Sequence, residues 1–247
     1  MIYNYQILVE YDGTQFVGWQ SQKNGISIQE TIEKVIKKLL KKKITIIGSG
    51  RTDKGVHALK QSANFKVNYK IKDELKFIKS LNFFLFKKSI SIIDLKKKNI
   101  NFHARYSAKK RYYKYYITNR EAPTTLKKNR SWHIRKPLDI NIMKKGAELL
   151  KKNKDFSTFR ASTCSAKSPI KTLEKITIIK KNNDIEICFV SKSFLQNQVR
   201  SMVGCLKYLA EKKWTLKKFR QVVNSKKRFN CAPPAPAQGL YLDKIKY

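Results

Sequence analysis

A single aspartate, Asp53, has the surroundings in this chain that most suggest chemistry. It lies in residues 48–58, Gly-Ser-Gly-Arg-Thr-Asp-Lys-Gly-Val-His-Ala, with Arg51 and Lys54 nearby and glycines on both sides. Cations beside a carboxylate favour its ionised form, and glycines let a ligand approach the backbone. An ionised aspartate can act as a general base or as a nucleophile. The same residues would also fit a turn closed by a local salt bridge, and spacing alone favours that structural alternative.

A second group of residues with chemical potential is the basic and aromatic run at residues 107–116, Ser-Ala-Lys-Lys-Arg-Tyr-Tyr-Lys-Tyr-Tyr. In a strand, alternate side chains face opposite sides, so Arg111, Tyr113 and Tyr115 share one face. One face could offer aromatic rings to a nucleobase, with cations beside it for phosphates. The alternative is a strand that packs its tyrosines into a core and leaves its lysines in solvent.

The third group is the helical pattern at residues 193–204, in which Arg200 lies beside an apolar face. An arginine in such a place usually pairs with a carboxylate, and this chain has few carboxylates to offer. The alternative is a surface arginine whose aliphatic stem covers apolar side chains.

The elements that must position these groups follow from hydrophobic periodicity and capping signals. Ser27 begins a capping box, and the apolar residues after it recur at helical spacing. In the first half, strands are expected at residues 5–11, 44–47, 63–67 and 90–95, and helices at residues 28–40 and 73–84. In the second half, strands are expected at residues 110–118, 172–179, 185–191 and 239–245, and helices at residues 140–151, 196–209 and 215–224.

The first half therefore follows the element order of a ferredoxin-like unit, β-α-β-β-α-β, and the second half repeats it loosely, which predicts an α+β fold. We expect an N-terminal unit at residues 1–104, carrying the Asp53 loop, and a C-terminal unit at residues 105–247. Two such units joined edge to edge would form an extended antiparallel sheet with helices on one face. A central cleft is expected at their junction, where binding sites commonly lie.

Charge and composition point to a polyanionic partner. The 247 residues carry 55 Lys and Arg against 17 Asp and Glu, a net charge of +38, and such a field attracts nucleic acid over long range. Codon bias toward lysine would inflate this charge, so its sign is more informative than its size. No apolar run approaches the roughly 20 residues of a membrane span. The widely spaced cysteines and isolated histidines predict a cytoplasmic protein without metal or cofactor.

The chain resembles the TruA family of tRNA pseudouridine synthases. The most specific likeness is Gly50-Arg51-Thr52-Asp53-x-Gly55-Val56-His57-Ala58. Seven segments follow the family's order over nearly the whole chain: residues 12–13 with 18–20, 50–58, 102–105 with Arg111 and Tyr113, 132–133 with 136–139, 155–160, 199–204, and 239–242. The departures are a proline-rich stretch at residues 230–235 and short connecting loops, which bear on how tRNA is positioned.

The resemblance implies the reaction and the role of each residue. These enzymes break the N1–C1′ glycosidic bond of uridine, turn the base, and join C5 to C1′, without a cofactor. Asp53 would be the catalytic nucleophile, attacking either C6 or C1′. Tyr113 would stack on the uracil and remove the C5 proton, and Arg200 would pair with Asp53. Arg51 would fill the gap in the RNA stack when the uridine flips out, a step that costs a few kcal/mol.

The resemblance also implies the partners: the anticodon arm of several tRNAs, modified at positions 38, 39 and 40, and a second copy of the chain in a homodimer. Two alternatives to an enzyme are a non-catalytic RNA-binding protein of ferredoxin-like fold and a structural, ribosome-associated protein. Both would share the positive charge, but neither needs the combination of Arg51, Asp53 and Arg200.

Overall fold

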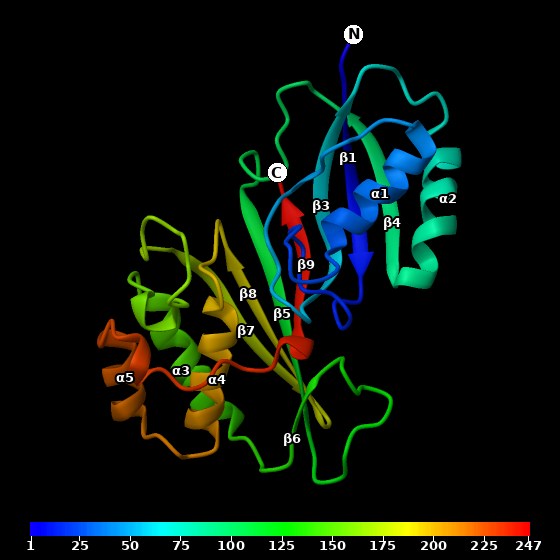
Figure 1. Cartoon of the computed structure of the whole chain (residues 1–247). Coiled ribbons are helices and arrows are strands. Elements are labelled where there is room, and N and C mark those ends of the chain that lie inside the picture. Colours follow the sequence, from blue (N-terminus) through cyan, green and yellow to red (C-terminus); the bar gives the residue numbers. More distant parts are fainter. The chain divides into compact units, whose positions relative to one another are not determined.

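The computed structural model describes residues 1–247 as two compact units (Figure 1). Unit 1 comprises Met1–Lys109 and Tyr241–Tyr247, and unit 2 comprises Lys110–Leu240. The division expected from the sequence was after residue 104. In the structure, unit 1 extends to Lys109 and also contains the C-terminal strand. Tyr247 contributes to this placement, since its hydroxyl donates to Ser62 Oγ at 2.7 Å and to the Ala104 carbonyl at 3.0 Å.

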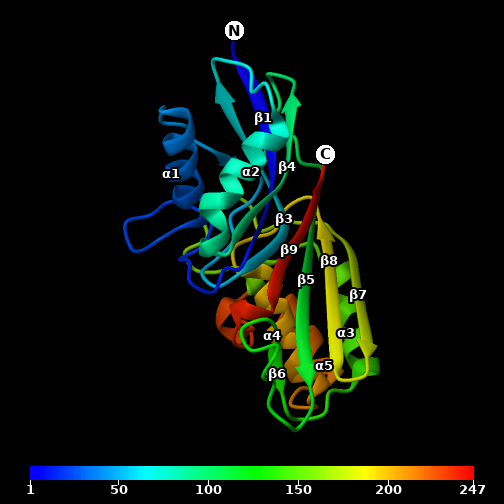
Figure 2. The same cartoon turned by 90° about the vertical axis from the view of Figure 1, so that its right-hand side faces the viewer.

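Unit 1 has the predicted β-α-β-β-α-β order, followed by the C-terminal strand. Its elements are β1 (Tyr3–Tyr11), α1 (Ile28–Leu40), β2 (Ile47–Gly48), β3 (His57–Val67), α2 (Glu74–Leu85), the 3-10 turn η1 (Phe86–Lys88), β4 (Ile90–Lys98) and β9 (Leu240–Lys246). The central strand β1 lies antiparallel between β4 and β3. Strand β3 also pairs with β2, antiparallel, and with the start of β9, parallel. Helices α1 and α2 cover one face of this sheet (Figures 1 and 2).

Local signals account for α1. Ser27 is its N-cap, and the Ser27 hydroxyl accepts from the Glu30 N–H at 3.2 Å, which satisfies one of the donors that a helix start leaves open. Ile28, Ile32 and Ile36 recur on one face of α1 and are fully buried. The predicted helix that begins at the Ser27 capping box is therefore confirmed.

The predicted strand at residues 44–47 is wrong. Only Ile47–Gly48 pairs with β3, and residues 44–46 form no regular element. Two side chains of α1 bond to the backbone of Ile46. Glu33 Oε1 accepts from the Ile46 N–H at 2.9 Å, and Gln29 Nε2 donates to the Ile46 carbonyl at 3.3 Å. These contacts satisfy the backbone groups that a neighbouring strand would otherwise bond.

Unit 2 has a smaller sheet, in which β8 lies between β5 and β7, all antiparallel, and the short β6 pairs with β5 in parallel. Its elements are β5 (Lys110–Asn119), β6 (Trp132–Ile134), α3 (Ile140–Lys152), η2 (Ser157–Phe159), β7 (Leu173–Lys181), β8 (Asp184–Ser191), α4 (Gln198–Ala210), α5 (Leu216–Asn224), η3 (Arg228–Asn230) and η4 (Ala237–Gly239). Strand β6 was not predicted. The predicted β7–β8 hairpin is confirmed, with Asn182 in the left-handed conformation at its turn.

The core of unit 2 lies between its sheet and α3, α4 and α5, which all lie on one face of the sheet (Figure 2). Its largest buried side chains are aromatic: Tyr115, Phe156, Phe159, Phe189 and Phe219. Each unit is thus a mostly antiparallel sheet with helices on one face, and the predicted α+β class is confirmed. The cleft at the junction of the units stays a prediction. None of the helices is both long and apolar enough to cross a membrane.

Candidate functional site

The segment that leads into Asp53 is fixed to strand β3 by buried polar contacts. The Ser49 N–H donates to the Ser62 carbonyl at 2.8 Å, and the Ser49 hydroxyl donates to Gln61 Oε1 at 2.7 Å. Gln61 in turn donates from Nε2 to the Gly50 carbonyl at 2.7 Å. Ser49 and Gln61 are fully buried, so these bonds are shielded from competing water. The start of the loop therefore has little freedom to move.

Thr52, two residues after Gly50, is held by the end of β1 and by the loop that follows it. Its carbonyl accepts from the Trp19 N–H at 3.1 Å, and its hydroxyl lies 2.8 Å from the Tyr11 hydroxyl. Gly18 allows this approach, because a Cβ at that position would lie 2.5 Å from the Thr52 carbonyl oxygen and 3.3 Å from the Asp53 carbonyl carbon. A β-carbon cannot fit there without moving the backbone that carries Asp53.

After Asp53 the chain turns sharply. The Val56 N–H donates to the Asp53 carbonyl at 3.1 Å, and Gly55 adopts a φ of +76°, which favours glycine. The Asp53 side chain is half-buried, while Arg51 on the same loop is exposed. The loop thus presents one carboxylate and one guanidinium from a backbone that is held on both sides.

His57 connects this loop to the loop after β1, a role that the sequence reasoning did not assign. Its Nδ1 lies 2.9 Å from Asp12 Oδ1 and 3.1 Å from the Gly13 backbone nitrogen. The ring is buried and stacks on Tyr241, with 4.6 Å between ring centroids. The only sequence signal for this role was that His57 and Asp12 fall in two of the segments that resemble the family.

The other two predicted site residues, Tyr113 and Arg200, belong to unit 2. Tyr113 lies on β5 opposite Phe189, and its ring makes an edge contact with Phe194 at 5.2 Å between centroids. It is 8% exposed, so most of the ring is packed against protein. Phe194 lies just before α4, the helix that carries Arg200.

Arg200 is held near the start of α4 by contacts from two directions. Its Nε donates to the Ala235 carbonyl at 2.7 Å, and its Nη1 donates to Asn197 Oδ1 at 3.2 Å. Asn197 precedes the helix in the left-handed conformation, with a φ of 61°. Two bonds at different nitrogens determine the plane of a guanidinium. Arg200 is therefore an oriented side chain and not a loose surface arginine.

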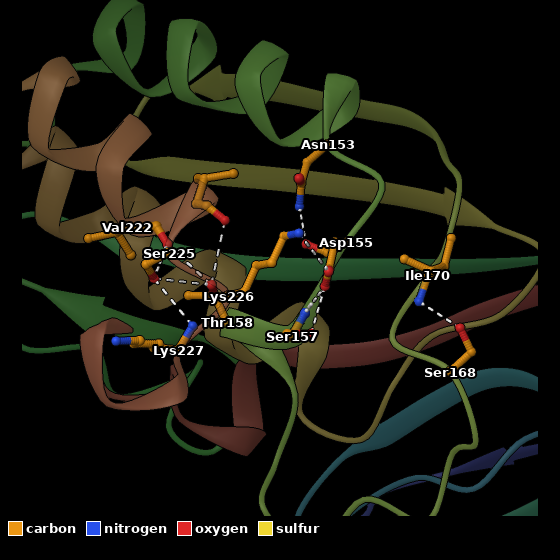
Figure 3. Close-up of polar contacts among 11 residues, drawn as sticks. Asn153, Asp155, Ser157, Thr158, Ser168, Ile170, Val222, Ser225, Lys226 and Lys227 are labelled. Atoms are coloured by element: carbon orange, nitrogen blue, oxygen red, sulfur yellow. Dashed lines mark hydrogen bonds and ion pairs between the residues drawn. The ribbon is translucent and has the colours of Figure 1, made fainter.

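The segment at residues 155–160 anchors the region between α3 and β7 (Figure 3). Asp155 Oδ1 accepts from the Ser157 N–H at 2.9 Å and from the Ser157 hydroxyl at 2.6 Å, while Lys226 Nζ lies 3.6 Å from Asp155 Oδ2. Thr158 donates to the Val222 carbonyl on α5 at 3.2 Å. This family-like segment therefore ties η2 to α5 and has no reactive geometry of its own.

We expect Asp155→Asn to lower thermal stability by an amount that depends on pH. The hydrogen bond from the Ser157 hydroxyl, with lesser help from Lys226, lowers the pKa of the Asp155 carboxyl in the folded protein. A depressed folded pKa contributes stability above the unfolded pKa of about 3.9, and this contribution is lost as the pH falls through the folded value. Thermal unfolding followed by circular dichroism should show a gap between wild type and variant that is constant at pH 5–7 and shrinks below about pH 4.

Ser157→Ala is the matched control for this prediction, because it removes the largest cause of the shift and keeps the carboxylate. In that background Asp155→Asn should change stability less at neutral pH. A gap that stays constant down to pH 3 would contradict the lowered pKa.

Comparison with known proteins decides the family. The sequence matches the profile of the tRNA pseudouridine synthase family over residues 7–107 and 147–247. The chain belongs to this family. It is 57% identical over 246 residues to the tRNA pseudouridine synthase A of Pelagibacter ubique, covering all of both chains. It is 41% identical to the proteins of that name from Parvibaculum lavamentivorans and Ehrlichia canis, covering 98% of this chain and 98% and 99% of theirs.

The family resemblance inferred from the seven segments is therefore confirmed, and this member of the tRNA pseudouridine synthase family is an isomerase that acts in tRNA modification. Membership in an enzyme family favours catalysis over the two binding-only alternatives. In unit 1, Arg51 and Asp53 lie on one loop. In unit 2, Tyr113 lies on β5 and Arg200 lies near the start of α4. No group of three or more His, Cys, Asp or Glu side chains is arranged to hold a metal ion.

Proposed function

We propose that this tRNA pseudouridine synthase isomerises uridine at positions 38, 39 and 40 in the anticodon arm, with Asp53 as the nucleophile. One observation carries the assignment. The backbone at Thr52 and Asp53 is held by Trp19, Tyr11 and the turn at Gly55, so the carboxylate leaves a rigid loop and is half-exposed. A nucleophile needs this combination of fixed direction and access to the substrate.

The reaction balances without any external reagent. The N1–C1′ bond breaks, a C5–C1′ bond forms, and the C5 proton leaves, while N1 gains a proton, so the product is an isomer of the substrate. In this proposal Asp53 attacks C6 or C1′, and Tyr113 stacks on the uracil and takes the C5 proton. Arg200 keeps the Asp53 carboxylate ionised by pairing with it, as opposite charges do.

Recognition of neighbouring positions without one sequence context requires contacts to the shape and backbone of the RNA. The net charge of +38 supports such contacts. Exposed Arg51 would replace the stacking that is lost when the uridine flips out. By the same resemblance we propose a homodimer that works in the cytoplasm.

A position-specific tritium assay tests this proposal. Three tRNA transcripts would each carry one uridine tritiated at C5, at position 38, 39 or 40, and a fourth would carry the label in the acceptor stem. We expect the protein to release tritium from the anticodon-arm labels only, because formation of the C5–C1′ bond expels the hydrogen at C5. Release confined to the acceptor-stem label would show that the site of action is wrong, while the family's chemistry would stand.

A further inference from the structure

A short proline-rich segment in unit 2, residues 231–236, lies directly against α4. The Ala235 N–H donates to the Arg200 carbonyl at 3.0 Å, and Arg200 Nε donates back to the Ala235 carbonyl at 2.7 Å. Gly204, one turn further along α4, permits this contact, since a Cβ there would lie 2.1 Å from the Pro233 carbonyl oxygen. This segment therefore supplies one of the two hydrogen bonds that orient the Arg200 guanidinium.

The segment is stiff. Three of its six residues are prolines at positions 233, 234 and 236, each of which has a restricted φ and no N–H to bond elsewhere. A displacement at Pro236 is thus transmitted to the neighbouring Ala235 carbonyl rather than absorbed by the backbone.

Tyr115 holds the far end of the segment. Its hydroxyl donates to the Pro236 carbonyl at 2.8 Å, and its ring is fully buried. Gly239 packs on this ring, where a Cβ would lie 2.6 Å from Cζ. Burial raises the pKa of the Tyr115 hydroxyl well above its ordinary value, against the opposing effect of the Arg200 charge. The hydroxyl consequently stays a donor throughout the range in which an enzyme works.

We propose that Tyr115 is a positioning residue for the isomerisation: its hydroxyl anchors Pro236, the adjacent Ala235 carbonyl then fixes Nε of Arg200, and the guanidinium is oriented for the reacting carboxylate. This inference rests on the proposed role of Arg200 beside Asp53. It assigns different roles to the two tyrosines that share a face of β5: Tyr113 contacts the uracil base, and Tyr115 positions Arg200.

The test is Tyr115→Phe, which removes one oxygen and keeps the buried ring. Tyr5→Phe is the matched control, because Tyr5 is equally buried in unit 1 and its hydroxyl accepts from the Ile71 N–H at 2.9 Å. Single-turnover rates with saturating tRNA should fall about tenfold for Tyr115→Phe and stay at the wild-type level for Tyr5→Phe, even if both melt earlier. The dissociation constant for tRNA should stay within about twofold of wild type.

Two further readouts separate positioning from mere stability. A misplaced Arg200 no longer favours the ionised carboxylate, so the acid limb of the pH–rate profile should move to higher pH in Tyr115→Phe. The ¹⁵Nε signal of Arg200, assigned with Arg200→Lys, should also shift. Replacing Tyr115 with 4-aminophenylalanine, which restores a donor at the same place, should recover the rate.

A wild-type rate in Tyr115→Phe would overturn the inference, and so would a slower rate with an unmoved acid limb and an unmoved Arg200 signal. The same rate assay tests the proposed function separately. If Asp53 is not the nucleophile, the Asp53→Asn variant remains active. The Arg200 Nε signal reports the geometry of unit 2 whichever residue is the nucleophile.

Discussion

We expect Asp53→Asn to lower the rate of tritium release from tRNA by at least about a thousandfold, because the amide cannot replace the carboxylate proposed as the nucleophile. The fold should survive this change. Asp53 uses its backbone carbonyl in the turn to Val56, and asparagine is well tolerated in turns. We expect the affinity for tRNA to change little, since phosphate contacts supply most of the binding free energy.

Asp94→Asn is the matched control for this result. Asp94 is also a partly exposed carboxylate in unit 1, and its Oδ2 lies 3.0 Å from Lys96 Nζ on the same strand. Its loss should leave the rate within about twofold of wild type, as for most surface ion pairs. An Asp53→Asn protein that is folded, binds tRNA and releases tritium at the wild-type rate would exclude Asp53 as nucleophile.

Gly18→Ala is expected to lower the stability of the protein strongly and to reduce activity as well. Gly18 has a φ of +120°, which alanine adopts only with strain, and its new Cβ would lie 2.5 Å from the Thr52 carbonyl oxygen. Strain of about 1–3 kcal/mol and a similar cost of overpacking add to a loss of roughly 2–6 kcal/mol. The displaced backbone carries Asp53, so the single-turnover rate should fall about a hundredfold.

Gly25→Ala separates backbone strain from displacement of the catalytic loop. Gly25 has a similar φ of +128°, but its Cβ would meet Val17 Cγ1 at 2.5 Å, the end of a side chain. This variant should lose stability to strain and keep a near wild-type rate in folded protein. Thermal unfolding and single-turnover kinetics on both variants distinguish backbone strain from displacement of the Asp53 loop. Equal rates in the two variants would contradict the role of Gly18 in placing Asp53.

Elements with local signals were predictable from the sequence. The helix at residues 28–40 follows from the Ser27 cap and the isoleucine spacing, and both are present in α1. The β7–β8 hairpin follows from asparagines at its turn. The prediction of a strand at residues 44–47 was wrong for a non-local reason. Side chains of α1, Gln29 and Glu33, bond to the backbone of Ile46, which the apolar run had assigned to a strand.

The sequence by itself determined the family, the conspicuous carboxylate at Asp53 and most of the helices and strands, because residue type, glycine placement and periodicity are local properties. Only the tertiary structure decided that β9 pairs with β3 and that Gly18 supports the Asp53 backbone. It also decided that Ala235, 35 residues from Arg200, orients that guanidinium. Such contacts join segments far apart in the chain, and their geometry arises only when the core packs.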